Sequence, residues 1–241
     1  MGSSVLSNAQ YTVLRVPVAS PRINEIVAKF RDTRLAAIKS DPSSSFVTYE
    51  VEIQHPLSVW QARLFGGLAC LVCVVNADLT LPPEDALLSG DWAGYVFIKE
   101  RVTYEEYYEF PAMKQGIPED PELETRWHIF DLFISPDHRG RSAGSMVVEG
   151  SLAAIRDALR LDGSGPKRAR VRLIANSKKE WLLRWYRRFG FLDRGSATLV
   201  QGFKANGWNV SIPEDNDSTE ELKAVWHNPI GRVMEIVIDV D

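Results

Sequence analysis

The 241-residue sequence has few cysteines, no excess of basic residues and no long apolar run, and each of these absences excludes a class of protein. It has two cysteines, too few for a disulfide-stabilised scaffold. It has no excess of basic residues, because 28 Lys and Arg stand against 32 Asp and Glu, and the net charge of −4 gives no broad cationic surface for nucleic acid. No apolar run approaches the roughly 20 residues that a membrane-spanning helix needs. We therefore expect neither a nucleic-acid partner nor a membrane span.

The two cysteines, Cys70 and Cys73, lie in the apolar run 68–75, whose β-branched residues predict a buried strand. On a strand this spacing points the two thiols to opposite faces. A metal site would want a second ligand pair, so we expect structural thiols and no metal. Free cysteines suit a reducing compartment and residues 1–6 lack the basic and apolar regions of a signal peptide, so we expect a cytoplasmic protein.

Hydrophobic periodicity predicts an α/β fold in a single domain, 1–241, with two insertions at about 103–126 and 202–229. The elements expected in the first half are strands at 11–18, 68–75 and 92–101, a helix at 21–39 and an amphipathic stretch at 57–65. Those expected in the second half are strands at 127–135, 170–175, 197–201 and 233–240, with helices at 140–161 and 178–189. The alternation of strand and helix after residue 127 predicts a crossover unit with parallel strands.

The most informative stretch runs from Asp131 to Gly150, where a strand, a proline-marked turn and a basic, small-residue segment lead into a helix. The first turn of a helix has N–H groups without intrahelical partners, and its dipole favours negative charge. Arg139 and Arg141 add positive charge, so this pattern is typical of a phosphate site. A basic helix entry with small residues placed for packing remains an alternative.

The segment resembles motif A of the GNAT superfamily of acetyltransferases, Gln/Arg-x-x-Gly-x-Gly/Ala after a strand that ends in an apolar-x-Pro turn. Five residues match the motif in register: Arg139, Gly140, Arg141, Ala143 and Gly144. Ser142 stands where the family most often has its first glycine. A second segment, Tyr186-Arg-Arg-Phe-Gly-Phe191, resembles the Tyr-x-x-x-Gly-Phe ending of motif B. Two matches in the right order are more specific than one, and together they cover residues 127–191.

The resemblance implies a mixed, mainly antiparallel central sheet flanked by helices, in which a splayed parallel strand pair binds CoA. It implies acetyl-CoA as the cofactor and CoA as its product. The residues that would bind the cofactor are Leu132, Phe133 and Ile134 through their main chain, then Arg139, Gly140, Arg141, Ser142, Ala143, Gly144 and Ser145, and Asn176. The family's asparagine, seven residues before the tyrosine, is replaced here by Lys179, and Asn176 lies ten before it.

The resemblance also implies the chemistry, which is direct attack of an amine on the thioester. Tyr186 is the candidate acid, because a phenol with a pKa near 10 can protonate a thiolate of similar basicity. His128 is the candidate base, since an ordinary histidine titrates near neutral pH. Asp131 is the reserve base, and a water chain is the further alternative. Each side chain has a structural alternative as well: Tyr186 can pack its helix and His128 can belong to the core.

The acceptor is less well specified by the sequence. Tyr104–Pro111 mixes carboxylates with aromatic rings, a combination that can hold a cationic amine, although it also suits a solvated acidic loop that packs through its rings. We expect a small primary amine, such as an amino sugar, polyamine or arylalkylamine, ahead of a protein lysine or N-terminus. A non-catalytic acyl-CoA sensor is the alternative of another class. The polar segment Lys204–Pro229 can cover an acceptor cleft or form a homodimer contact.

Overall fold

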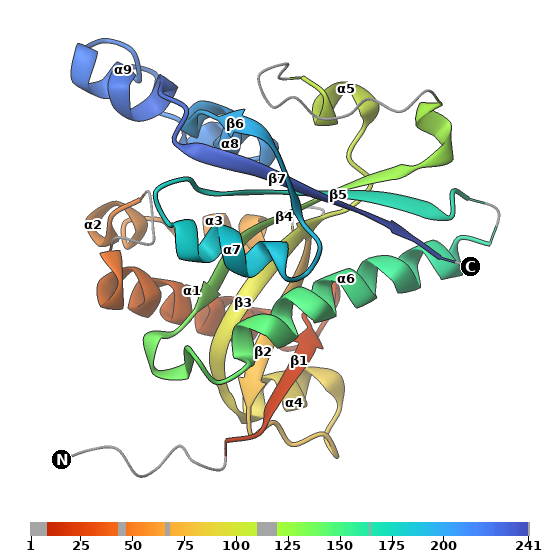
Figure 1. Cartoon of the computed structure of the whole chain (residues 1–241). Helices are drawn as coiled ribbons and strands as arrows, with labels where there is room; N and C mark the ends of the chain where they lie inside the picture. The colour runs from red at the N-terminus through yellow and green to blue at the C-terminus, as the bar shows by residue number, and fades with distance from the viewer. Residues whose placement is uncertain (1–8, 43–46, 66–67, 110–119, 164, 241) are drawn as a thin grey trace. The chain divides into compact units, whose positions relative to one another are not determined.

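The computed structural model describes residues 9–42, 47–65, 68–109, 120–163 and 165–240 (Figure 1). Its strands are ordered β1-β2-β3-β4-β5-β7-β6 in one mixed sheet. Their bounds are β1 (Tyr11–Arg15), β2 (Leu68–Val75), β3 (Asp91–Lys99), β4 (Thr125–Ile134), β5 (Arg168–Asn176), β6 (Leu192–Ala197) and β7 (Gly231–Asp239). Strands β4 and β5 run parallel, whereas β1–β2, β5–β7 and β6–β7 run antiparallel. This confirms the predicted mixed, mainly antiparallel sheet with a parallel pair and flanking helices.

The chain divides into two compact units. The first contains the described residues up to Ile98 together with Asp131–Leu152. The second contains the described residues of Lys99–Phe130 and Ala153–Asp241. Strand β4 and helix α6 (Ala143–Leu161) each continue from one unit into the other. No helix in the described ranges is long and apolar enough to cross a membrane.

In the first unit, helix α1 (Ile23–Ser40) packs its apolar stripe on strand β3. The Phe30 ring meets the Tyr95 and Phe97 rings edge-on, at centroid distances of 5.3 and 5.5 Å. The helix begins two residues after the expected Pro21, because the Ser20 hydroxyl accepts from the N–H of Arg22 and holds a turn there. The other helices of this unit are α2 (Tyr49–Glu52), α3 (Leu57–Phe65), α4 (Pro83–Ser89) and the 3-10 turn η4 (Pro136–His138).

The two cysteines behave as the strand pattern predicts. Both are buried and neither is in a disulfide. Gly150 of α6 lies against the side chains of Val13 and Leu71. Val13 pairs with Cys73 in the sheet, so the Cys73 side chain points to the face that α6 covers. Cys70, an odd number of residues away along β2, points to the opposite face. Burial raises the pKa of both thiols, to about 11 for Cys73 and higher for Cys70, so neither is a nucleophile at neutral pH.

The second unit is built around β7, which pairs with β5 along nine residues and with β6 on its other edge. Its helices are α5 (Tyr104–Tyr107), α7 (Glu180–Arg187), α8 (Leu199–Ala205) and α9 (Glu220–His227), with 3-10 turns η3 (Pro121–Leu123) and η5 (Asn209–Ser211). The Phe203 ring of α8 and the Trp226 ring of α9 pack 5.3 Å apart. The predicted insertion at 202–229 thus carries helical structure, and residues 110–119 of the other insertion lie outside the described residues.

The predicted strand at 197–201 is wrong. Strand β6 ends at Ala197, and α8 begins two residues later. The Thr198 hydroxyl accepts from the N–H of Gln201, whose side chain accepts from the N–H of Thr198. This reciprocal capping box starts a helix and outweighs the β-propensity of the run that follows Thr198.

Candidate active site

The turn between β4 and α6 in the first unit carries the basic, small-residue segment in an irregular backbone. Gly140 and Ser142 adopt left-handed conformations, with φ of 74° and 71°. The N–H of Met146 donates to the carbonyl of Ser142, which closes the first turn of α6. The N–H groups of the three residues between them have no intrahelical acceptor, and these residues begin the 19-residue helix α6. A negatively charged group is favoured at this helix start.

The space around the turn suits a bulky anion. A Cβ added at Gly140 would meet nothing within 4 Å, so the backbone is open on that side. Ser142 is exposed and keeps the left-handed shape at a steric cost that glycine would not have. The residues present therefore fit a phosphate-bearing cofactor, with Ser142 as a strained replacement for glycine.

Arg139 has partners within the protein. Its Nη2 lies 2.8 Å from a carboxylate oxygen of Asp41, and its Nε donates to the carbonyl of Ile134 at 3.0 Å. Its side chain is still 43% exposed. Arg139 therefore ties the turn to the end of β4, and an incoming anion would compete with Asp41 for it. Arg141 is exposed.

The main-chain segment expected to face the pantetheine follows an irregularity in β4. Asp131 has φ 50°, a left-handed conformation inside a strand. The parallel register of β4 with β5 covers Thr125–Ile129, and β4 then runs on to Ile134. Leu132 and Phe133 are half-buried, whereas Ile134 is 7% exposed. Asp131 is ion-paired with Arg34, so its carboxylate is already committed to a cation, which disfavours it as a base.

Tyr186 lies on α7 in the second unit and is buried, with 6% of its surface exposed. Its ring packs edge-on against Phe191 and tilted against Trp185, with centroids 5.9 and 4.9 Å away. Within the described residues its hydroxyl has no hydrogen-bond partner. Burial raises the pKa of Tyr186. The phenol therefore keeps its proton at neutral pH, as a donor must, although the same shift makes it a weaker acid.

His128 is fully buried in the second unit. Its Nε2 lies 2.8 Å from the side-chain oxygen of Asn206, its Nδ1 lies 3.4 Å from Nε of Arg172, and its ring stacks on Phe130. Burial, followed by the charge of Arg172, lowers the pKa of His128 well below its ordinary value. These contacts favour a structural imidazole, and its role as a base stays a prediction.

Asn176, the remaining cofactor candidate, ends strand β5. Its side-chain oxygen accepts from the N–H of Lys178 at 2.9 Å, and its carbonyl accepts from the N–H of Lys179 at 3.1 Å. These bonds form an Asx turn that leads into α7. The asparagine thus has a local structural role, and its contact with a cofactor stays a prediction.

Several side chains of the acidic, aromatic segment around α5 already contact other residues of the second unit. Tyr107 is buried and donates to Glu235 at 2.8 Å, while Glu106 is paired with Lys99. The guanidinium of Arg126 lies 5.7 Å from the Tyr104 ring centroid, so this ring already has a cationic partner. This packing matches the alternative in which the rings anchor the loop.

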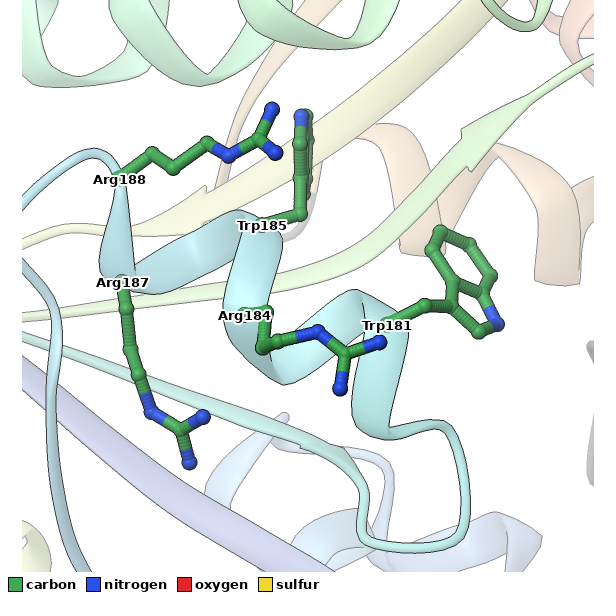
Figure 2. Close-up of a pocket in the computed structure, with 5 residues that line it drawn as sticks. All are labelled: Trp181, Arg184, Trp185, Arg187 and Arg188. Atoms are coloured by element: carbon green, nitrogen blue, oxygen red, sulfur yellow. The ribbon is translucent and has the colours of Figure 1, made fainter.

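A pocket of about 590 Å³ lies along α7 and its C-terminal end (Figure 2). Five residues of α7 and its C-terminal end line it, and all of them are tryptophan or arginine: Trp181, Arg184, Trp185, Arg187 and Arg188. Arg187 is paired with Glu180 and Asp193. None of the predicted site residues lines this pocket, so its position does not bear on their roles.

Comparisons with known proteins agree with the motif pattern. An acetyltransferase of the GNAT family from Streptococcus pneumoniae matches the structure with a TM-score of 0.52, at 12% identity over 95% of this chain and 99% of its own. The chain has the GNAT fold. A second GNAT-fold match is NAA60 from Arabidopsis thaliana in complex with acetyl-CoA, with a TM-score of 0.50 and 12% identity over 94% of this chain and 99% of its own. Neither a family model nor a curated protein sequence matches the chain.

Sequence reasoning missed the partners of two candidate residues. Asn206 and Arg172 surround His128, and Arg34 holds Asp131. A signal was present for the arginines: Arg34 occupies a core-facing position of α1, four residues after Phe30, and Arg172 interrupts the apolar run of β5. A cation at a core position requires a buried acceptor, and its identity cannot be read from local sequence.

Proposed function

We propose that this chain is an acetyl-CoA-dependent N-acetyltransferase that acts on a small primary amine. The observation that carries the proposal is the helix start at Ser142–Ala143, where left-handed Gly140 and Ser142 leave the backbone accessible to an anion after β4 and η4. That turn carries the motif that resembles the family's pyrophosphate loop, and it stands in a chain with the GNAT fold. The cofactor complex of the NAA60 neighbour supports acetyl-CoA as the ligand.

In this proposal the chain's own residues bind and orient the substrate and move protons. Ala143, Gly144 and Ser145 donate N–H groups to the pyrophosphate, and Arg141 adds charge. Leu132 and Phe133 present main-chain groups to the pantetheine and the acetyl carbonyl. Acetyl-CoA, when bound, supplies an activated acyl group that an amine can attack.

Tyr186 is proposed to protonate the thiolate. Its hydroxyl has no hydrogen-bond partner in the described part of the chain and is therefore available as a donor. Its raised pKa keeps it protonated across the neutral range. The amine's proton is proposed to leave through His128 or water, and the lowered pKa of His128 favours water. A His128→Gln variant that retains its activity would assign this step to water.

Amine screening tests the proposal. Purified protein with acetyl-CoA is offered amino sugars, polyamines, arylalkylamines, a lysine-rich peptide and a peptide with a free N-terminus, and acetylated products are identified by mass spectrometry. We expect product with a small amine. Product with a peptide alone would move the acceptor to the protein class, which the same chemistry permits.

A second candidate is a non-catalytic acyl-CoA sensor. The observation that favours it is the complete burial of His128, which leaves no titrating base at that position. Calorimetric binding of acetyl-CoA without turnover of any amine would support the sensor. Absence of both binding and turnover would reject both candidates.

A further inference from the structure

The left-handed Asp131 in β4 is held by a residue that no motif identifies. We propose that Arg34 is a positioning residue for acetyl transfer, because it fixes Asp131 and so sets the direction of the main-chain groups at Leu132 and Phe133. The inference rests on the proposed function, since those groups matter as ligands only if acetyl-CoA binds there. Every contact that supports it lies within the first unit.

The backbone at Asp131 needs support from outside the strand. A non-glycine residue at φ 50° is in a sparsely populated region, and aspartate tolerates it better than most side chains. Such a conformation is strained and persists only when the surrounding structure determines it. The side chain of Asp131 is 19% exposed and is paired with Nη1 of Arg34. This ion pair is the determining contact.

Arg34 is itself held from several sides. Its side chain is 6% exposed, its Nη1 donates to the hydroxyl of Tyr95 at 3.1 Å, and its Nε donates to Glu52 at 3.3 Å. Glu52 also accepts from Arg63 at 2.6 Å. Burial lowers the pKa of Arg34, but Asp131 and the other partners outweigh it and raise the value well above normal. The guanidinium is therefore a fixed charge that joins α1, α2 and β3 to Asp131.

Stability alone does not explain an arginine at this place. Arg34 lies on the buried face of α1, between Phe30 and Ala37. A large apolar side chain at this position would fit the pattern of that face. Replacing a buried ion pair by apolar residues is often neutral or stabilising. An apolar residue at position 34 could not form an ion pair with the carboxylate of Asp131. The pair therefore specifies backbone geometry.

The same segment is fixed at its other end. The carbonyl of Ile134 accepts from Arg139, and the N–H of Ser135 donates to the carbonyl of Ala93 at 2.8 Å. A Cβ at Gly94 would lie 2.2 Å from the carbonyl oxygen of Phe133, so β3 approaches this segment too closely for any side chain there. Leu132 and Phe133 thus lie between two anchored points. Releasing Asp131 would reorient them without removing any group that touches the cofactor.

The test compares variants that release Asp131 with one that disturbs the same network elsewhere. Arg34→Gln and Asp131→Asn remove the pair while keeping hydrogen-bonding side chains, and asparagine tolerates the left-handed conformation. Arg34→Lys restores the charge. Arg63→Gln is the matched control, because it removes the ion pair of Arg63 with Glu52 and leaves the Arg34–Asp131 pair in place. The readouts are kcat with acetyl-CoA, Kd for CoA by calorimetry, and amide exchange at Leu132 and Phe133.

We expect Arg34→Gln and Asp131→Asn each to lower kcat by about tenfold or more, because small misplacements of a reacting group have effects of that size. Kd for CoA should stay within about twofold, since the phosphate turn keeps its own contacts. The double variant should be no worse than either single one, and Arg34→Lys should recover part of the loss. If Arg34→Gln folds and has the same kcat as Arg63→Gln, the proposal is wrong. If Arg34→Gln does not fold, an Asp131→Asn variant with the kcat of the wild-type protein overturns the proposal instead.

Amide exchange separates this proposal from the proposed function. If the wild-type protein transfers no acetyl group, the proposed function fails, but exchange still reports on the contact. Faster exchange at Leu132 and Phe133 in Arg34→Gln than in Arg63→Gln shows that Arg34 fixes this segment. Equal exchange in the two variants overturns that claim.

Discussion

Arg172 directs its Nε at Nδ1 of His128 across 3.4 Å, and both side chains are fully buried. A guanidinium N–H can only donate, so Nδ1 is the acceptor and the proton of the neutral ring is on Nε2. That proton is donated to the side-chain oxygen of Asn206. Burial disfavours a second proton on His128, and that proton would also place a positive charge against Arg172, so the pKa of His128 is lowered.

The first prediction is that stability falls as the pH drops below about 6.5, the ordinary pKa of histidine. Above that pH His128 is neutral in both states and contributes no penalty. Below pH 6.5, His128 is protonated in the unfolded chain but stays neutral in the folded chain. The free energy of unfolding therefore decreases by up to about 1.4 kcal/mol per pH unit. Urea unfolding at pH 7.5, 6.5 and 5.5 measures the slope.

The control for this prediction is a second histidine. His128→Gln should flatten the slope between pH 6.5 and 5.5, even if the variant is less stable throughout. His227→Gln, at an exposed position on α9, is the comparison variant, and the slope of His128→Gln should be clearly flatter than its slope. An unaltered slope in His128→Gln would contradict the assignment of a neutral buried imidazole.

The second prediction concerns the hydroxyl of Tyr186. Tyr186→Phe should leave the free energy of unfolding within about 1 kcal/mol of wild type, because the lost hydroxyl has no hydrogen-bond partner in the described residues. The same variant should lower kcat by about 100-fold, the usual scale for loss of a general acid. Trp181→Phe changes an exposed aromatic residue on the same helix and should change neither quantity. Equal kcat in both variants would reduce Tyr186 to a packing residue.

The third prediction follows from the left-handed Ser142. Ser142→Gly removes the steric cost of φ 71° and should raise or preserve the affinity for CoA, despite the general flexibility of glycine. Ser142→Val should weaken CoA binding and destabilise the turn, because a β-branched residue strongly disfavours this conformation. Calorimetric titration with CoA compares the two. Weaker binding by the glycine variant together with full binding by the valine variant would show that the turn does not need this backbone shape.

The fourth prediction concerns the carboxylate beside the phosphate turn. Asp41→Asn should tighten CoA binding by a few-fold at low salt, because it removes a negative charge that competes for Arg139. The gain should shrink at high salt as the charges are screened. Weaker binding would mean that Asp41 serves to hold Arg139 in its binding position.

The sequence predicted more of the fold than of the site. The boundaries of β2 and α3 followed from their hydrophobic patterns, and the parallel pair β4–β5 followed from strand–helix alternation. The Asp131–Arg34 pair could not be predicted, because it joins residues 97 positions apart and depends on tertiary packing. The same holds for Asn206, whose contact with His128 spans 78 positions.

The most direct test of the central claim is release of free thiol from acetyl-CoA by the wild-type protein, in the presence of each amine of the panel. The account predicts thiol release that depends on one class of small amine, and a loss of this release in Tyr186→Phe while CoA still binds. No amine-dependent release by a folded wild-type protein that binds CoA would contradict it.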